Sequence, residues 1–484
     1  MRVCFLNKTK FSFATFLLIA LIIGFLNSCE RDAFKPGRAG QLSFSKDTVM
    51  FDTIFTNLGT ATYKLTVINP HNYKVVLDSV YLAGGVNSNF KVNIDGDPSS
   101  LLRHLTINSK DSLYIFIQAY IKGTNENDPF LNLDSIVFVS GENVSDVKLW
   151  AVGQNVIPFH NDRIQSQEWN NSKPYLIMGT LTVDSGAVLK IHEGTKIYFQ
   201  KNANISVNGT LQVLGTFQAP VSFRGSRLES DYDSIPGEWG GINLKGNDQV
   251  NVISNAVIRN GNIGIAIGDY RNTKKVKLAL TNTIISNMGY SALIAYQAEI
   301  EAKNCVFANS NNTICKLLYG GKYSFTHCTF ANYGAMYVGK EVGEKTLILQ
   351  NYIDYIDSNN RPITAYNNLE NAFFGNSVIY GDGQSEIAFN KKGQVTFNYT
   401  FDRCLIKTTS EIIAANSSSF IECIADKAPK FIKPGTENFR LDTLSPAKDF
   451  GKLEFGNLVP LDLDNNSRIS DLKPDLGAYE RIEK

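Results

Sequence analysis

A short motif recurs through the second half of the chain at a nearly constant interval, and it constrains the fold more than any other feature. Each copy consists of a polar residue, a small residue and then a pair that favours a β-strand. The polar residues are Asn255, Asn282, Asn304, His327, Asn376 and Arg403. The first four copies start 27, 22 and 23 residues apart. The motif therefore indicates a structural unit of about two dozen residues that is repeated many times.

A second and shorter period agrees with the first one. Pairs of apolar residues, two positions apart, recur every eight residues at Leu181/Val183, Leu189/Ile191, Ile197/Phe199 and Ile205/Val207. Three such strand-and-turn units make one repeat of 24 residues. A β-rich repeat of this length predicts a parallel β-helix, in which each three-sided coil stacks on the previous one at about 4.8 Å.

The repeated segment resembles the right-handed parallel β-helix family that includes pectate lyases and many polysaccharide-active proteins. The resemblance covers roughly residues 160–430, which corresponds to about eleven coils, and we assign residues 155–430 to this domain. It implies that the recurring Asn residues form a ladder, since an amide side chain can bond between equivalent turns and tolerates a left-handed backbone. His327 and Arg403 interrupt this ladder.

Residues 42–154 follow a different rhythm, in which apolar residues alternate over short segments separated by turn residues. Examples are Leu113-x-Ile115-x-Ile117 and Ile136-x-Phe138. This alternation predicts an N-terminal β-sandwich of about seven strands. Together with the predicted β-helix, it makes the whole chain all-β. The segment also resembles the immunoglobulin-like modules that precede repeat domains in exported bacterial proteins.

The first 28 residues have the composition of a signal peptide. Three basic residues precede an apolar run of 16 residues, Phe11 to Leu26, which is shorter than the ~20 residues of a spanning helix. Leu26-Asn27-Ser28-Cys29 resembles a bacterial lipobox, which implies lipidation of Cys29, although Asn27 departs from the usual pattern. Plain cleavage and an uncleaved anchor stay open as alternatives. Residues 29–41 would form a tether, and we expect an outer-membrane lipoprotein of the cell envelope.

The C-terminal segment, residues 431–484, resembles the closing segment of exported β-helix proteins. We expect it to cap the open edge of the last coil, because unpaired backbone groups there would promote aggregation. Its run Asp462-x-Asp464-x-Asn466 has the first oxygen ligands of a calcium loop, but Ser467 and Lys473 replace the Gly and Glu that such a loop needs. The run therefore predicts a structural turn, and we expect no cofactor.

Charge and motif composition exclude several functions. The chain has 47 Lys and Arg residues against 46 Asp and Glu residues, and Arg2, Lys8 and Lys10 precede the expected cleavage site. The remaining chain therefore has no excess of cations for nucleic acid. The sequence strings that carry catalysis in the resembled family are absent, and the five His residues show no zinc-ligand spacing. Catalytic groups of a β-helix come from different coils, so missing strings favour a protein without catalysis only moderately.

The longest polar excursion in the first half of the repeats is the strongest candidate for a binding site. It runs from Gly225 to Gly237 and contains Arg227, Asp231, Tyr232 and Asp233. Charged residues beside an aromatic ring are typical of a sugar-binding loop. A solvated loop, in which Trp239 fills an edge of the core, is the alternative. A second excursion, Asp269 to Lys275, is similar but less aromatic.

These observations lead to one functional hypothesis and one alternative. The hypothesis is a monomeric lipoprotein without catalytic activity, whose β-helix binds a polysaccharide or a surface protein and whose partners include the membrane through its anchor but no nucleic acid. The alternative is a divergent polysaccharide lyase or glycoside hydrolase. Carboxylates that converge with Lys or Arg on one sheet face would favour the enzyme.

Overall fold

The computed structural model describes residues 37–246, 249–272, 274–335, 338–341, 343–470 and 473–483. The signal peptide, Cys29 and most of the tether lie outside the described residues. The chain divides into two compact units, Met1–Gln154 and Asn155–Lys484. Each unit is described by itself below.

The first unit is a β-sandwich of nine strands in two sheets. The four-stranded sheet has the order β1-β3-β7-β5 and the five-stranded sheet the order β2-β9-β8-β4-β6. The strands are β1 (Ser43–Phe44), β2 (Thr48–Phe55), β3 (Tyr63–Ile68), β4 (Val75–Leu82), β5 (Phe90–Ile94), β6 (Leu101–Ile107), β7 (Ser112–Ala119), β8 (Phe130–Ser140) and β9 (Asn143–Gln154), with one 3-10 turn, η2 (Gly85–Asn87). The pairing is antiparallel except between β2 and β9.

The predicted alternation is present in the sandwich, which also has strands that the sequence did not predict. Residues such as Ile115, Ile117 and Phe138 point between the two sheets and are buried, as their spacing predicts. The structure has more strands than the expected seven. β1 has only two residues, and β6 is interrupted by the left-handed backbone of His104, so neither shows a regular alternation.

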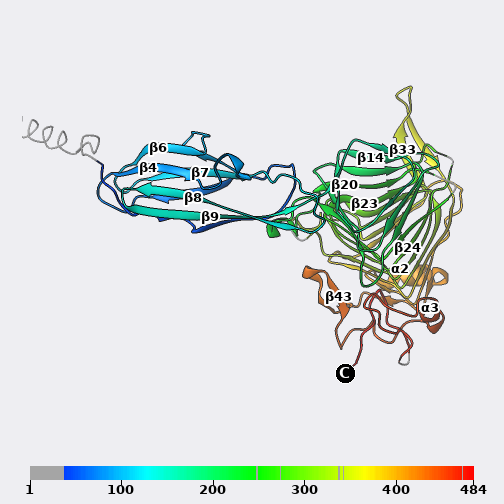
Figure 1. The fold of residues 1–484 in the computed structure, drawn as a ribbon. Coiled ribbons are helices and arrows are strands. Elements are labelled where there is room, and N and C mark those ends of the chain that lie inside the picture. The colour runs from blue at the N-terminus through cyan, green and yellow to red at the C-terminus, as the bar shows by residue number, and fades with distance from the viewer. Residues whose placement is uncertain are drawn as a thin grey trace, which may run out of the picture. The chain divides into compact units, whose positions relative to one another are not determined.

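The second unit is a parallel β-helix built from three long sheets, and its stacked strands are visible in Figure 1. Sheet I has eleven strands, one for each coil: β10 (Ile157–His160), β13 (Tyr175–Met178), β16 (Lys196–Phe199), β19 (Val221–Gly225), β22 (Ala256–Arg259), β25 (Ile284–Met288), β28 (Val306–Ser310), β31 (Thr329–Asn332), β36 (Val378–Gly381), β39 (Leu405–Ile406) and β41 (Ile424–Ala425).

Sheets II and III form the other two sides. Sheet II contains β11 (Arg163–Ile164), β14 (Thr180–Val183), β17 (Asn204–Val207), β20 (Trp239–Leu244), β23 (Gly261–Ile267), β26 (Ser291–Tyr296), β29 (Cys315–Leu318), β32 (Leu347–Gln350) and β37 (Ile387–Asn390). Sheet III contains β12 (Gln167–Trp169), β15 (Val188–His192), β18 (Thr210–Leu214), β21 (Val250–Ser254), β24 (Lys277–Thr281), β27 (Glu299–Lys303), β30 (Gly321–Thr326), β35 (Leu369–Gly375), β38 (Thr400–Asp402) and β40 (Phe420–Ile421). The hairpin of β33 (Tyr352–Ile356) and β34 (Pro362–Tyr366) projects from the coils.

The recurring polar motif occupies one corner of the coils. All six of its first residues have a left-handed backbone, with φ between 46° and 56°. The amide Nδ2 of Asn304 donates to Oδ1 of Asn282 at 2.8 Å, as expected for a ladder. His327 continues the ladder, because its Nε2 lies 3.0 Å from Nδ2 of Asn376. The left-handed bend explains why the motif starts with Asn so often.

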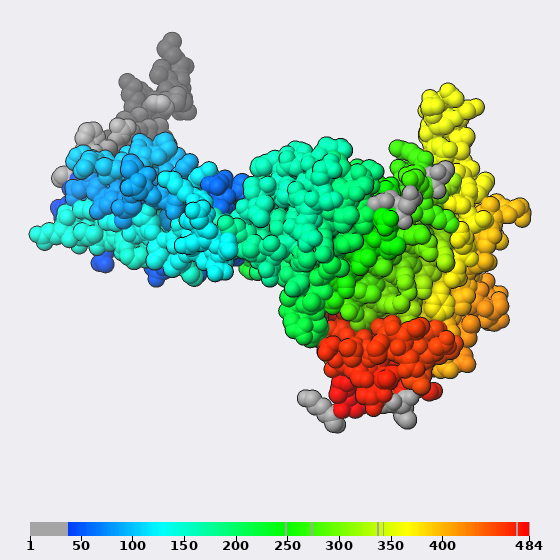
Figure 2. Space-filling model, turned by 45° about the vertical axis from the view of Figure 1, so that its right-hand side comes forward, coloured from blue at the N-terminus to red at the C-terminus, as the bar shows by residue number. Residues whose placement is uncertain are grey.

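The packing contacts of the C-terminal segment lie on one side of the coils, and its expected role as a cap of the last open edge stays a prediction. The segment runs back along the outer face of sheet I, where Phe439, Leu476 and Tyr479 pack against Val306 and Val378. Figure 2 shows this segment, coloured red, against one side of the β-helix. Its elements are β42 (Phe431–Lys433), η5 (Pro434–Thr436), β43 (Asn438–Leu441) and α3 (Leu453–Leu458). The outer face of sheet I is apolar here, and covering it removes apolar surface from water.

A short helix lies near the C-terminal end of the stack of coils. α2 (Ser410–Ala415) and the turn η4 (Ser417–Ser419) take the place of a strand of sheet II between β39 and β40. Ile413 of α2 packs against the core of the coils. Thr409 caps this helix by accepting a hydrogen bond from the backbone N–H of Ile412.

Candidate functional site

The predicted binding loop connects β19 of sheet I with β20 of sheet II and contains one 3-10 turn, η3 (Ser230–Tyr232). Side chains of neighbouring coils hold its base. Nδ2 of Asn260 donates to the carbonyl oxygens of Tyr232 and Asp233, at 3.2 and 3.0 Å. Nδ2 of Asn287 donates to the carbonyl oxygen of Ser234 at 3.0 Å. The rigid stack of coils therefore fixes the orientation of the loop.

The predicted ligand residues lie together in this loop, but three of them already have partners within it. Arg227 donates two hydrogen bonds from Nε and Nη2 to Glu229, and its guanidinium lies 4.0 Å from the ring centroid of Tyr232. Asp233 accepts a hydrogen bond of 2.6 Å from Nη2 of Arg224. Asp231 is exposed. The structure thus brings Arg227 and Tyr232 together and directs Asp233 toward Arg224.

Glu238, at the end of the loop, has an unusual environment. Both of its carboxylate oxygens are buried, and neither has a hydrogen-bond partner among the described residues. The carboxyl group lies against Gly225, where an added Cβ would be 2.0 Å from Oε2 of Glu238. Burial raises the pKa of Glu238 to about 7, although the positive charges of Arg224 and Arg227 act in the opposite direction. Glu238 can therefore carry a proton at neutral pH.

Arginine side chains of adjacent coils meet beside Glu238 on the outer face of sheet I. Phe223 of β19 pairs with Ile258 of β22, which places Arg224 beside Arg259. The C-terminal segment adds an acid to this row: Oε2 of Glu437 lies 3.3 Å from Nη2 of Arg259 and accepts a hydrogen bond from Oγ of Ser286 at 3.1 Å. We call Arg224, Arg227, Glu238, Arg259 and Glu437 the charged site.

The charged site holds a large share of the unsatisfied polar atoms in the described part of the chain. Nine buried side-chain polar atoms lack a partner there, and five of them belong to Arg224, Glu238, Arg259 and Glu437. Buried polar groups of proteins are nearly always hydrogen-bonded, because leaving one unpaired costs about 1–3 kcal/mol. A concentration of such atoms in one place indicates a site that is built for something other than stability.

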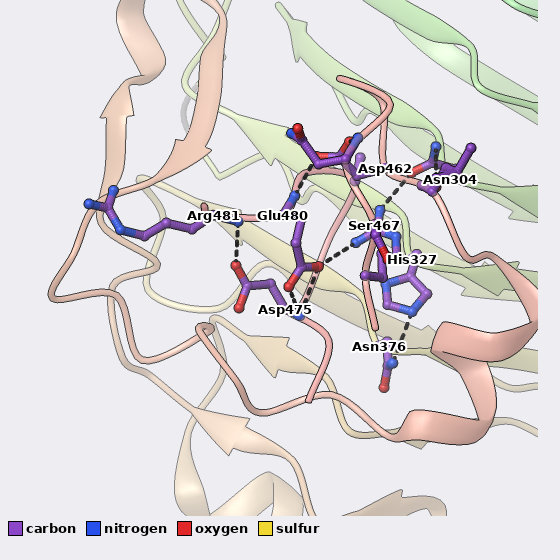
Figure 3. Close-up of polar contacts among 12 residues, drawn as sticks. Asn304, His327, Asn376, Asp462, Ser467, Asp475, Glu480 and Arg481 are labelled. Atoms are coloured by element: carbon purple, nitrogen blue, oxygen red, sulfur yellow. Dashed lines mark hydrogen bonds and ion pairs between the residues drawn. The ribbon is translucent and has the colours of Figure 1, made fainter. Parts of the chain in front are cut away.

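A buried polar network ties the C-terminal segment to the coils (Figure 3). Arg468 is fully buried, pairs with Glu480 at 3.3 Å and donates a hydrogen bond of 2.7 Å to Oδ1 of Asn304. Beside it, burial and the charge of Arg468 lower the pKa of His327, so this imidazole is neutral. The ladder corner of the coils is thereby tied to the end of the chain.

The acidic run at Asp462 belongs to the same network, and its oxygens are engaged by N–H groups. Oδ1 of Asp462 accepts hydrogen bonds from the backbone N–H of Asp464 and of Asn466, and Oδ2 accepts one from the N–H of Glu480. This geometry is the structural turn that the sequence predicts. Within the described ranges, no group of three or more His, Cys, Asp or Glu side chains could hold a metal ion.

Residues 162–274, which contain β11–β23 and all of the charged site except Glu437, match the family model of the "pectate-lyase like beta helix domain". This region is therefore similar to pectate-lyase-like β-helix domains. The parallel sheets continue far beyond the matched residues, so the parallel β-helix extends along the second unit.

Three solved structures share limited similarity with the chain. The Escherichia coli chaperone DraB is 15% identical (TM-score 0.17), with 24% of this chain and 56% of that chain covered. The periplasmic chaperone SfaE is also 15% identical (TM-score 0.18; 28% and 67% covered). A family 123 glycoside hydrolase from Clostridium perfringens is 11% identical (TM-score 0.19; 27% and 30% covered). These TM-scores are too low to carry any argument. No curated protein matches the sequence.

The sequence analysis predicts the loop between β19 and β20 as a binding site but misses Arg259 and Glu437. A signal for Arg259 exists, because Phe223-Arg224 and Ile258-Arg259 occupy the same position of successive coils. Glu437 gives no such signal, since it lies 178 residues beyond its partner Arg259. Trp239 is 1% exposed and stacks on Phe199 at 4.1 Å, so the prediction that it fills the core is confirmed.

Proposed function

We propose that the chain is a monomeric cell-envelope lipoprotein whose pectate-lyase-like β-helix binds a glycan at the charged site. One observation carries the proposal: buried polar atoms of Arg224, Glu238, Arg259 and Glu437 have no hydrogen-bond partner among the described residues. Arg227, whose charge acts on Glu238, also lies over the ring of Tyr232. Sugar hydroxyl groups both donate and accept hydrogen bonds. They can satisfy guanidinium donors and carboxylate acceptors at the same site, and a loop movement would bring these atoms within reach.

Glycan binding by two matched arginine variants tests this proposal. In an array of neutral and acidic glycans, the full chain in detergent should bind at least one glycan. Arg259→Gln should weaken that binding by at least tenfold, because it removes a donor and leaves Glu437 without its ion pair. Arg163→Gln is the control, since Arg163 is an exposed arginine of β11 that pairs with Asp184. Equal affinities of the two variants would refute the charged site.

The membrane anchor is a separate part of the proposal and rests on Leu26 to Cys29. Among the residues that the structure describes, no helix is long and apolar enough to span a bilayer. Two acyl chains on Cys29 would supply stable anchoring. Cys29→Ala should therefore move the protein from the membrane fraction to the soluble fraction after a carbonate wash. Retention of the variant in the membrane fraction would contradict lipidation as the anchor.

Glu238 favours a second candidate function, the cleavage of a polysaccharide. A carboxyl group with a pKa of about 7 can donate a proton to a leaving group at neutral pH. If the domain is a lyase or hydrolase, a glycan bound in the array should be shortened, and Glu238→Gln should abolish the shortening while binding persists. Binding without any release of reducing ends or unsaturated products would exclude this candidate.

A further inference from the structure

Three tyrosines from three separate segments meet at the corner between sheets II and III. Tyr270 lies in the loop after β23, Tyr296 ends β26, and Tyr355 belongs to the projecting hairpin strand β33. The ring centroid of Tyr270 lies 6.1 Å from that of Tyr296 and 5.6 Å from that of Tyr355, with tilted planes. All three residues are partly exposed. We call Tyr270, Tyr296 and Tyr355 the tyrosine ledge.

One buried amide holds the supports of the ledge together. Nε2 of Gln297 donates to the carbonyl oxygens of Asp269 and Asn272, which flank Tyr270 in its loop. Oε1 of Gln297 accepts a hydrogen bond of 3.0 Å from Nδ2 of Asn367, which follows the hairpin. Gln297 is also the neighbour of Tyr296 in the chain, so one side chain links the loop of Tyr270, the end of β26 and the residue that follows the hairpin. A ledge that is ordered in this way loses little entropy when a ligand binds.

The charges around the ledge are balanced. Lys275 forms an ion pair with Glu370, and Lys392 forms one of 3.0 Å with Asp354. The guanidinium of Arg271 donates hydrogen bonds of 3.1 and 2.9 Å to Oη of Tyr270. Lys275 and Lys392 are paired with carboxylates, whereas the hydroxyl of Tyr270 is neutral and leaves Arg271 charged. After the hydrogen bond to Tyr270, the negative charge of Asp269 also helps to raise the pKa of Arg271, and it offsets the charge of Arg271, so the corner has little positive charge left for an acidic ligand. The ledge therefore suits an uncharged ligand.

The rings themselves indicate which uncharged ligand fits. A tyrosine ring offers an apolar face, and its hydroxyl group can both donate and accept a hydrogen bond. Burial, followed by the neighbouring tyrosines, raises the pKa of Tyr296, so its hydroxyl keeps its proton at any physiological pH. Sugar rings combine apolar C–H faces with hydroxyl groups at their edges, which matches both properties of the ledge.

We propose that the tyrosine ledge is a second binding site, specific for a neutral glycan chain. It shares no residue with the charged site, and the two sites lie on different sides of the coils: the charged site on sheet I, the ledge at the corner of sheets II and III. The hairpin of β33 and β34, which carries Tyr355, stands out from the coils in Figures 1 and 2. Two sites on one rod would let the protein hold one polymer at two points or bridge two polymers.

Affinity measurements with neutral oligosaccharides test the ledge. The probes are glucan, mannan, xylan and galactan hexasaccharides, titrated into the full chain in detergent. At least one probe should bind, and Tyr355→Ala and Tyr270→Ala should each weaken it by at least tenfold. Tyr355→Phe should stay within threefold of the wild type, because the ring face makes most of the contact. Tyr114→Ala is the matched control, since Tyr114 is a 42% exposed tyrosine of the sandwich with Lys64 over its ring.

Each outcome separates the ledge from the charged site. Loss of neutral-probe binding in the ledge variants, with Arg259→Gln unaffected, would support the ledge whatever happens at the charged site. The ledge is wrong if none of the four probes binds, if Tyr355→Ala and Tyr270→Ala bind as the wild type does, or if Tyr114→Ala weakens binding equally. Thermal unfolding of each variant would show whether a loss of binding comes from a loss of folding.

Discussion

The outer face of sheet I is used in two different ways along the same β-helix. In the coils of β16, β19 and β22 one row of this face consists of Tyr198, Arg224 and Arg259, which are polar. Further along, the same row continues through Ser286 to Ala308 and Ala331. Arg224 is partly exposed, whereas Ala308 and Ala331 are completely buried under the C-terminal segment.

This difference shows how a β-helix divides its residues between folding and function. Inward positions must be apolar in every coil, because they form one continuous core. Outward-facing side chains are not part of this core and can be polar. Where they are apolar, another segment has to cover them, and where they are charged, they can bind a ligand. Ser286 marks the boundary, since it contacts Glu437 of the C-terminal segment where the covered part begins.

Within the covered part of sheet I, the largest effect should come from breaking the buried ion pair. Arg468→Ala leaves Glu480 charged and buried without its partner, which should lower the free energy of unfolding by about 3–5 kcal/mol. Chemical denaturation measures the loss. The control is Arg440→Ala, whose pair with Asp464 is partly exposed and should contribute about 1 kcal/mol or less. Similar losses in both variants would mean that the network of Figure 3 does not hold the cover in place.

Apolar packing under the cover gives the next largest effect. Leu476 is 1% exposed and packs in the cluster between the C-terminal segment and sheet I. Leu476→Ala should cost about 2–4 kcal/mol through lost contacts and the cavity left behind. Leu444→Ala, in the same segment but 72% exposed, should change stability by about 0.5 kcal/mol or less. If Leu476→Ala were as mild as its control, the segment would not be a packed cover.

The open, charged coils should instead show a dependence on pH. The pKa of Glu238 is about 7 in the folded chain and near its ordinary value of 4.5 in the unfolded chain. Between these values the folded state holds more protons on Glu238 than the unfolded state does. The contribution of Glu238 to the free energy of unfolding therefore falls as pH rises from about 4.5 to 7 and is constant on either side of that window.

Glu238→Gln removes this titration. The variant should therefore lose less stability than the wild type over the same range, as measured by denaturation at pH 4.5, 6 and 7.5. Glu229→Gln is the control: burial acts to raise the pKa of Glu229, but hydrogen bonds with Arg227 and the backbone, together with the charge of Arg227, outweigh burial and lower this pKa. Parallel pH profiles for wild type and Glu238→Gln would show that Glu238 is not the titrating group.

The smallest effect is expected at the surface of the loop. Asp233 pairs with Arg224 but is 59% exposed, so Asp233→Asn should cost about 1 kcal/mol or less. Tyr232→Ala should be equally mild in stability, while Trp239→Ala should cost about 3–5 kcal/mol because Trp239 fills the core. A severe loss in Tyr232→Ala would show that this ring is packing rather than part of a binding site.

The sequence by itself determined the repeat length, the parallel β-helix, the sandwich and the left-handed corner at Asn255, Asn282 and Asn304. These features follow from local chemistry, since the inward positions recur with a fixed period and Asn tolerates the bend that each coil needs. The tertiary structure alone decided which outward residues meet. Arg259 and Glu437, or Tyr270 and Tyr355, come together through the register of stacked coils and the return path of the C-terminal segment. The spacing of residues in the sequence does not predict such contacts, because the repeat pattern constrains the inward-facing residues and not the outward-facing ones.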